Sequence, residues 1–203
     1  GMKILAGWFA DARGFAIGAL VGALAVGSAL PHLLRAVGGV GAPRTVLYGA
    51  AGLATVGGLL VLAVEPRPHQ APAAPFDPGA IGRLLRDRAT GLANLGYFGH
   101  MWELYAAWTW IPAYLAASAA AGTGGGDALA SLVAFATIAV GGVGAVAAGS
   151  VADRLGRTTV TTASMVVSGL ACLGAGPVFG RSLAVGVPFV LVWGVAIVAD
   201  SAQ

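Results

Sequence analysis

The residues best suited to chemistry lie in one short stretch, YFGHMWELYAAWTWIPAYL, residues 97 to 115. A histidine and a carboxylate three positions apart, His100 and Glu103, fall on the same face of a helix. Histidine changes charge near neutral pH, and a carboxylate one turn away can also take up and release a proton. Continuing this face in helical steps adds Ala107, Trp110 and Tyr114. The pattern predicts a stripe that exchanges a proton and offers aromatic faces to an organic solute.

We assign proton exchange to His100 and Glu103, and contact with the solute to Trp102, Tyr105 and Trp110. The alternative is that His100 and Glu103 pair with each other or with another helix, while the aromatic rings only pack. An intramembrane hydrolase using His100 and Glu103 also stays open. A metal site is disfavoured, because two ligands without a cysteine or a third carboxylate nearby make a poor site. We therefore expect no metal and no cofactor.

Two further ionisable residues lie near the ends of apolar stretches. His32 follows Pro31, and proline frees a backbone carbonyl one turn earlier, so we expect His32 at a helix break where hydrogen bonds are available. Asp200 closes the last apolar stretch, and we interpret it as a gate or interface residue rather than a solute ligand. His32 is thus the second candidate for solute or proton binding.

The composition indicates which solvent surrounds the elements that carry these residues. Hydrophobic residues make up 58% of the chain, charged residues only 9%, and the mean hydropathy is +0.85. Soluble domains have about a quarter charged residues, so most of this chain faces lipid. Six charge-free intervals match the roughly 20 residues that a helix needs to cross a bilayer: 14–34, 45–64, 104–126, 128–152, 158–180 and 182–199. The prediction is an all-α, multi-pass membrane bundle.

The positions of glycine predict how the helices pack, and the positions of lysine and arginine predict how the chain is oriented in the membrane. Most of the 33 glycines fall inside the apolar intervals, where small residues let helices approach closely. If the segment before Gly14 is cytoplasmic, then eight of the 11 Lys and Arg residues face the cytoplasm. Only Arg35, Arg44 and Arg181 remain outside. The net charge of +3 then needs no nucleic acid to explain it, and the expected partners are the lipid bilayer, a small-molecule solute and protons.

The stretch GSVADRLGR, residues 149 to 157, concentrates charge in a short cytoplasmic turn between two spans. It resembles the signature G-x-x-x-D-R-x-G-R of the major facilitator superfamily. That resemblance implies two six-helix bundles that rock about a site at the membrane midplane. It also implies that the motif acts as a conformational latch between helices, carried by its glycines and charged residues: Gly149, Asp153, Arg154, Gly156 and Arg157.

The resemblance also places the chain within the twelve-helix fold. Residues 1–65 would end the N-terminal bundle with helices five and six, 66–90 would be the cytoplasmic Pro-rich linker, and 91–203 would supply helices seven to ten. Residues 28–35, GSALPHLL, depart from the Gly-Pro-x-x-Gly-Gly form associated with proton-driven drug antiporters. The chain as given would be an incomplete transporter.

The function that follows is secondary active transport of a small solute by alternating access, coupled to protons, in a plasma membrane of bacterial type. Small organic anions, nitrate-like ions and sugars remain open as solutes. The alternatives are a membrane-embedded enzyme and a scaffold or sensor that keeps the fold without transporting.

Overall fold

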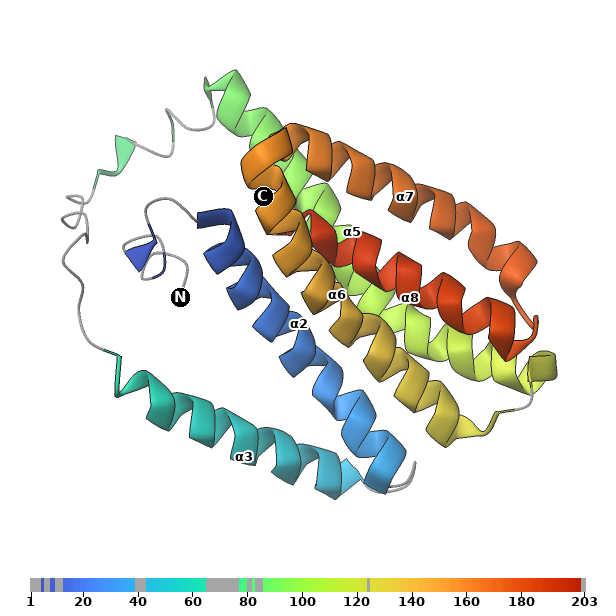
Figure 1. Ribbon diagram of the computed structural model, residues 1–203. Helices are drawn as coiled ribbons and strands as arrows, with labels where there is room; N and C mark the ends of the chain where they lie inside the picture. Colours follow the sequence, from blue (N-terminus) through green and yellow to red (C-terminus); the bar gives the residue numbers. More distant parts are fainter. Residues whose placement is uncertain are drawn as a thin grey trace.

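The computed structural model describes residues 5, 8–9, 13–38, 43–64, 77–79, 82, 86–123 and 125–201. Long helices account for nearly all of these residues, and the described part contains no strand (Figure 1). In chain order they are α2 (Arg13–Gly38), α3 (Pro43–Val61), α5 (Arg88–Ser118), the π-helical turn η1 (Ala119–Thr123), α6 (Asp127–Leu155), α7 (Arg157–Val178) and α8 (Leu183–Ala199). The all-α prediction is confirmed for these residues.

The described helices have the length and composition of membrane helices. Four of them, α2, α3, α6 and α7, are long and apolar enough to cross a bilayer. Helix α8 is equally apolar but has only 17 residues. Helix α5 has 31 residues and carries both Arg88 and Glu103. The prediction of a multi-pass membrane protein is supported at this level, whereas the count of six spans stays a prediction.

Helix α5 differs from the expected crossing at residues 104–126. It begins at Arg88, with Asp87 as its N-cap accepting a hydrogen bond from the Thr90 N–H, and it ends at Ser118. The hydrogen bonds from Thr90 lower the pKa of the Asp87 carboxyl, so this cap persists well into the acid range. The expected start was misplaced because counting uncharged residues stops at Glu103, whose side chain the bundle accommodates in the middle of the helix.

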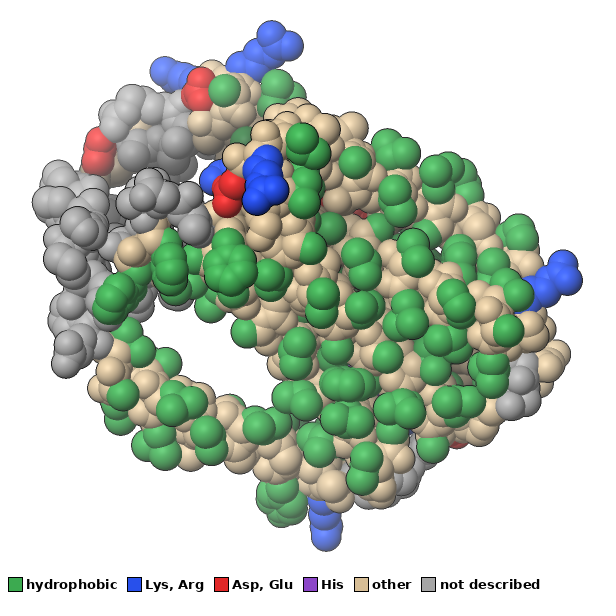
Figure 2. All heavy atoms as spheres, viewed as in Figure 1, with side chains coloured by type: hydrophobic (Ala, Val, Ile, Leu, Met, Phe, Trp, Pro, Cys, Tyr) green, Lys and Arg blue, Asp and Glu red, His purple; other side chains and the backbone are tan. Residues whose placement is uncertain are grey.

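The helices run up and down between two ends of the molecule (Figure 1). The beginnings of α2 and α5, the α6–α7 junction and the C-terminal end of α8 lie towards one end, at the upper left. The end of α2, the η1 turn and the α7–α8 junction lie towards the other. Apolar side chains cover the visible face between these ends, and the charged groups gather near them (Figure 2). Lys3, Arg67 and Arg83, which count in the predicted orientation, lie outside the described residues.

Helix α6 lies between α2 and α8, and glycine lets all three backbones approach closely. On α2, Gly14, Gly18 and Gly22 recur every four residues. A Cβ atom on Gly18 would lie 2.6 Å from the carbonyl oxygen of Ala145, and one on Gly22 would lie 2.7 Å from that of Gly142. No side chain fits between these backbones, so Gly18 and Gly22 serve helix packing as predicted.

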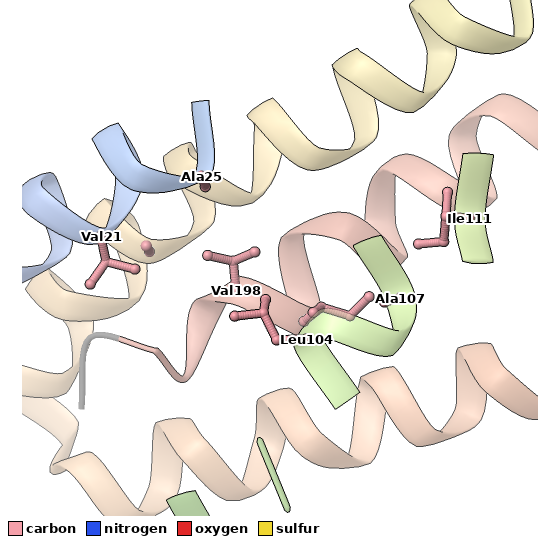
Figure 3. Packing of buried hydrophobic residues seen from close by; sticks show 8 residues of the cluster. Val21, Ala25, Leu104, Ala107, Ile111 and Val198 are labelled. Atoms are coloured by element: carbon pink, nitrogen blue, oxygen red, sulfur yellow. The ribbon is translucent and has the colours of Figure 1, made fainter. Parts of the chain in front are cut away.

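A neighbouring face of α6, reached by the adjacent residues, makes a second close contact, with α8. A Cβ atom on Gly141 would lie 2.7 Å from the carbonyl oxygen of Gly194. Apolar side chains from α2, α5 and α8 complete the core beside this contact (Figure 3): Val21, Ala25, Leu104, Ala107, Ile111 and Val198. The core thus fixes the rotation of α5 about its axis, and with it the directions of His100 and Glu103.

Helix α3 has no buried residue, and α2 is its main packing partner among the described elements. Its apolar side chains, including Leu47, Tyr48 and Leu59, are exposed in this structure. A bilayer is the environment in which such a helix is stable.

Candidate functional site

His100 points from α5 into the bundle, towards the end of α8. Its side chain is buried, with Nδ1 3.0 Å from Oδ2 of Asp200 and Nε2 2.8 Å from the Ser201 hydroxyl oxygen. Asp200 is the C-cap of α8 and is itself buried. The structure therefore assembles a His–Asp–Ser cluster from two helices that are about 100 residues apart in sequence.

The position of Asp200 requires a partner that can neutralise its charge. Asp200 is a carboxylate at the negative end of the α8 dipole and is removed from water, which is an unfavourable position for an unneutralised charge. A protonated His100 would neutralise it. The contact between Nδ1 and Oδ2 lacks the direction of a hydrogen bond, and both His100 Nδ1 and Asp200 Oδ1 have no hydrogen-bond partner. The pair is thus a buried polar contact between α5 and the end of α8.

Glu103 points towards α7. The Ser168 hydroxyl donates a hydrogen bond to Oε1 of Glu103, and the indole N–H of Trp193 on α8 lies 3.2 Å from the same hydroxyl oxygen. Ser168 is near the middle of α7, about 16 Å from the start of that helix at 1.5 Å per residue. Glu103 is therefore level with the middle of a membrane-length helix, held by the Ser168 hydroxyl, which in turn accepts a hydrogen bond from Trp193 on α8.

A groove of ≈ 390 Å³ opens beside this carboxylate. We call it the Glu103 groove. Its chemically distinctive lining residues are Trp102, Glu103, Trp110, Tyr114, Cys172 and Trp193. Trp102 and Trp110 form an exposed rim, and the hydroxyl of Tyr114 is already used as a donor to the carbonyl oxygen of Ala175.

The structure brings together most of the predicted stripe but divides its two ionisable members. Trp102, Glu103 and Trp110 share the groove, as do Ala107 and Tyr114. His100 does not line it, and it contacts α8 where Glu103 contacts α7. His100 and Glu103 therefore do not pair with each other. Each of them pairs with a residue from another helix.

Two other predicted contacts lie elsewhere. Tyr105 does not line the Glu103 groove, and its ring meets that of Trp108 edge-on at a centroid distance of 5.8 Å. His32 is partly buried on α2 and also lies outside the groove. The expected helix break beside it is wrong, because α2 continues through Pro31 to Gly38. Membrane helices tolerate an internal proline in this way.

Sequence reasoning missed Ser168, Trp193 and Ser201, and it gave Cys172 no role. A hydroxyl or an indole inside an apolar helix carries no signal of its own, since each also occurs in ordinary helix packing. Asp200 was interpreted as a gate or interface residue, without its partner His100. Only the rotation of α7 and α8, which packing fixes, brings these side chains to α5.

The GSVADRLGR motif forms the junction between α6 and α7. Gly156 alone separates the two helices, with φ +87°, a conformation that favours glycine. Gly149 packs against the backbone of Gly14. A Cβ atom on Gly14 would lie 2.5 Å from Oδ1 of Asp153, so this carboxylate sits at the first turn of α2, where the helix dipole favours negative charge. Arg154 and Arg157 are exposed at the same end.

The His100–Asp200 pair leads to a stability prediction. Replacing Asp200 with Asn or His100 with Ala is expected to destabilise the bundle by about 3–5 kcal/mol, because either change leaves one buried polar partner behind. The double variant should cost clearly less than the sum of the two single changes. Thermal unfolding of the four proteins in one detergent measures this coupling. Strict additivity would show that the two side chains do not interact.

Among the described residues, no group of three or more His, Cys, Asp or Glu side chains is placed to hold a metal ion. Comparisons of the chain with protein-family models, curated proteins and solved structures found no match.

Proposed function

We propose that this chain belongs to a proton-coupled secondary transporter of a small solute. The observation that supports the proposal most is the position of Glu103, a carboxylate level with the middle of a membrane-length helix and open to an aromatic groove. Ionisable groups inside membrane bundles are costly, and they typically mark solute and ion pathways. A groove that combines one carboxylate with several aromatic faces can hold a solute and a proton in turn.

The His100–Asp200 pair supplies a second proton site beside the first. His100 is three residues before Glu103 on α5, which is a rise of about 4.5 Å along the helix. Movement of α8 relative to α5 would separate Asp200 from His100 and change how firmly the proton is held. This gives the bundle a means of linking proton release to a helix movement.

Alternating access of the major facilitator type is the mechanism that accords with the α6–α7 junction. Its Asp153 touches the first turn of α2, so the motif links a helix before the Pro-rich linker to one after it. A latch there would hold the two parts together on one side of the membrane and release them in the other state. In this proposal the membrane is the plasma membrane of a bacterial-type cell.

One observation favours a second candidate, a membrane-embedded hydrolase. Ser201, His100 and Asp200 are connected in the order hydroxyl, imidazole, carboxylate, as in serine hydrolases. Neither Ser201 nor His100 lines the Glu103 groove, however, so the groove does not bring a substrate to the hydroxyl. Hydrolysis without net solute movement would favour this candidate over transport.

The experiment that tests the proposal is proton movement in sealed liposomes containing the purified transporter to which this chain belongs. A pool of small organic solutes is added with and without an imposed pH gradient, and internal pH is followed with a trapped dye. Transport predicts solute-dependent proton flux that protein-free liposomes lack. Silence over the whole pool would contradict proton coupling.

A further inference from the structure

The lining of the Glu103 groove carries negative charge and aromatic surface but no basic group among the described residues. Among the described residues, its charged side chains are a single carboxylate, and no Lys, Arg or His contributes to it. Three tryptophans and one tyrosine supply most of the remaining distinctive surface: Trp102, Trp110, Trp193 and Tyr114. Such a site attracts positive charge and apolar surface together.

The charge of Glu103 is left without a cationic partner in the described structure. Its hydrogen-bond partner is the neutral hydroxyl of Ser168, which is within reach of the neutral indole N–H of Trp193. A carboxylate whose hydrogen-bond partner is a neutral hydroxyl is stabilised further by a bound cation. A cation bound in the groove would lie beside the carboxylate oxygens of Glu103.

The aromatic residues extend this preference beyond a bare ion. The faces of tryptophan and tyrosine attract ammonium-type cations through the negative face of the ring, and clusters of such rings recognise quaternary ammonium groups. A volume of ≈ 390 Å³ falls in the range of pockets that bind small organic molecules. The site is thus sized for an organic cation rather than for a proton alone.

The same lining disfavours the solutes that the sequence left open. An organic anion or a nitrate-like ion would meet the Glu103 carboxylate without a basic group to offset it. A sugar needs several hydrogen-bond partners, but the Ser168 and Tyr114 hydroxyls already donate within the protein. An anion therefore finds no complementary charge in the groove, and a sugar finds few polar partners besides the Glu103 carboxylate.

We propose that the Glu103 groove binds a lipophilic organic cation, such as a tertiary amine in its protonated form or a quaternary ammonium or phosphonium ion. The Glu103 carboxylate neutralises the charge, and Trp102, Trp110, Trp193 and Tyr114 surround the apolar substituents. This inference rests on the proposed transport function for its physiological meaning, since it names the solute class of that same site.

The test compares two ions of the same shape and opposite charge, tetraphenylphosphonium and tetraphenylborate, by equilibrium dialysis against the purified protein in detergent. We expect saturable binding of the cation and at least tenfold weaker binding of the anion. Glu103→Gln is expected to weaken cation binding by at least about tenfold. Asp127→Asn, which removes an exposed carboxylate at the start of α6, is the matched control and should bind as the unchanged protein does.

A second variant keeps the test decisive if Glu103→Gln fails to fold. Trp110 is 70% exposed, so Trp110→Ala should leave the bundle intact and weaken cation binding about two- to fivefold. Equal binding of the two ions, or full cation affinity in either groove variant, would overturn the proposal and indicate a lipid-facing apolar surface. Cation binding without proton flux in liposomes would instead support the site and contradict the transport function.

Discussion

Replacing Glu103 with Gln is expected to reduce solute-driven proton flux by about two orders of magnitude, because the variant removes the carboxylate that exchanges the proton. Glutamine has nearly the same shape, and its side-chain carbonyl oxygen can still accept the hydrogen bond from Ser168. The loss should therefore appear in transport rather than in folding. The measurement is the initial rate of proton movement in sealed liposomes.

Asp127→Asn is the control for the loss of one negative charge, and its flux should remain close to that of the unchanged protein. Unfolding temperatures of the three proteins establish that they are equally folded. If Glu103→Gln retained the normal flux and the normal pH dependence, the proton would have to move by another route. The His100–Asp200 pair would then be the first place to look.

The second large effect is expected from a single methyl group on α8. A Cβ atom on Gly194 would collide with the backbone carbonyl oxygen of Thr137 on α6, and backbone cannot move aside as a flexible side chain can. We expect Gly194→Ala to destabilise the bundle by about 1–3 kcal/mol, as overpacking of a tight core does. Because α8 carries Trp193 and Asp200, both polar clusters on α5 should be disturbed as well. Thermal unfolding in detergent measures the first effect.

Gly186→Ala provides the matched control on the same helix, since nothing lies within 4 Å of a Cβ atom there. Alanine is the better helix former, so this variant should be as stable as the unchanged protein or slightly more so. The same comparison can be repeated on α2 with Gly22→Ala and Gly27→Ala. Equal unfolding temperatures for the two members of a pair would contradict the close helix approach.

The sequence was sufficient to predict most of the helices, because charged residues separate long uncharged, apolar intervals along the chain. The intervals 14–34, 128–152 and 158–180 each lie within one of the helices, or within a few residues of its bounds. Helix α5 was the exception. Its sequence has a charge in the middle, and whether such a charge ends a span or is held inside the bundle depends on a partner from another helix, here Ser168.

The candidate site was predictable only along one helix. Helical spacing correctly grouped Glu103, Ala107, Trp110 and Tyr114, which share the groove. The same spacing could not separate His100 from Glu103, because their directions diverge towards α8 and α7 respectively. Contacts between helices depend on the angles at which the helices cross and on their rotations, which the close glycine contacts determine. The periodicity of a single helix does not predict these angles.

Cys172 offers the most direct measurement of the central claim that the Glu103 groove is a solute pathway. It is the sole cysteine of this sequence, it is exposed, and it lines the groove. The experiment measures its reaction rates in membranes with cationic and anionic methanethiosulfonate reagents, each relative to a free thiol, with Cys172→Ser as the blank. Our account predicts reaction with both polar reagents and a clear preference for the cationic one, because a charged reagent reaches the thiol only through water and the groove is negative. A thiol that resists both polar reagents but reacts with membrane-permeant N-ethylmaleimide would place the groove in lipid and contradict the account.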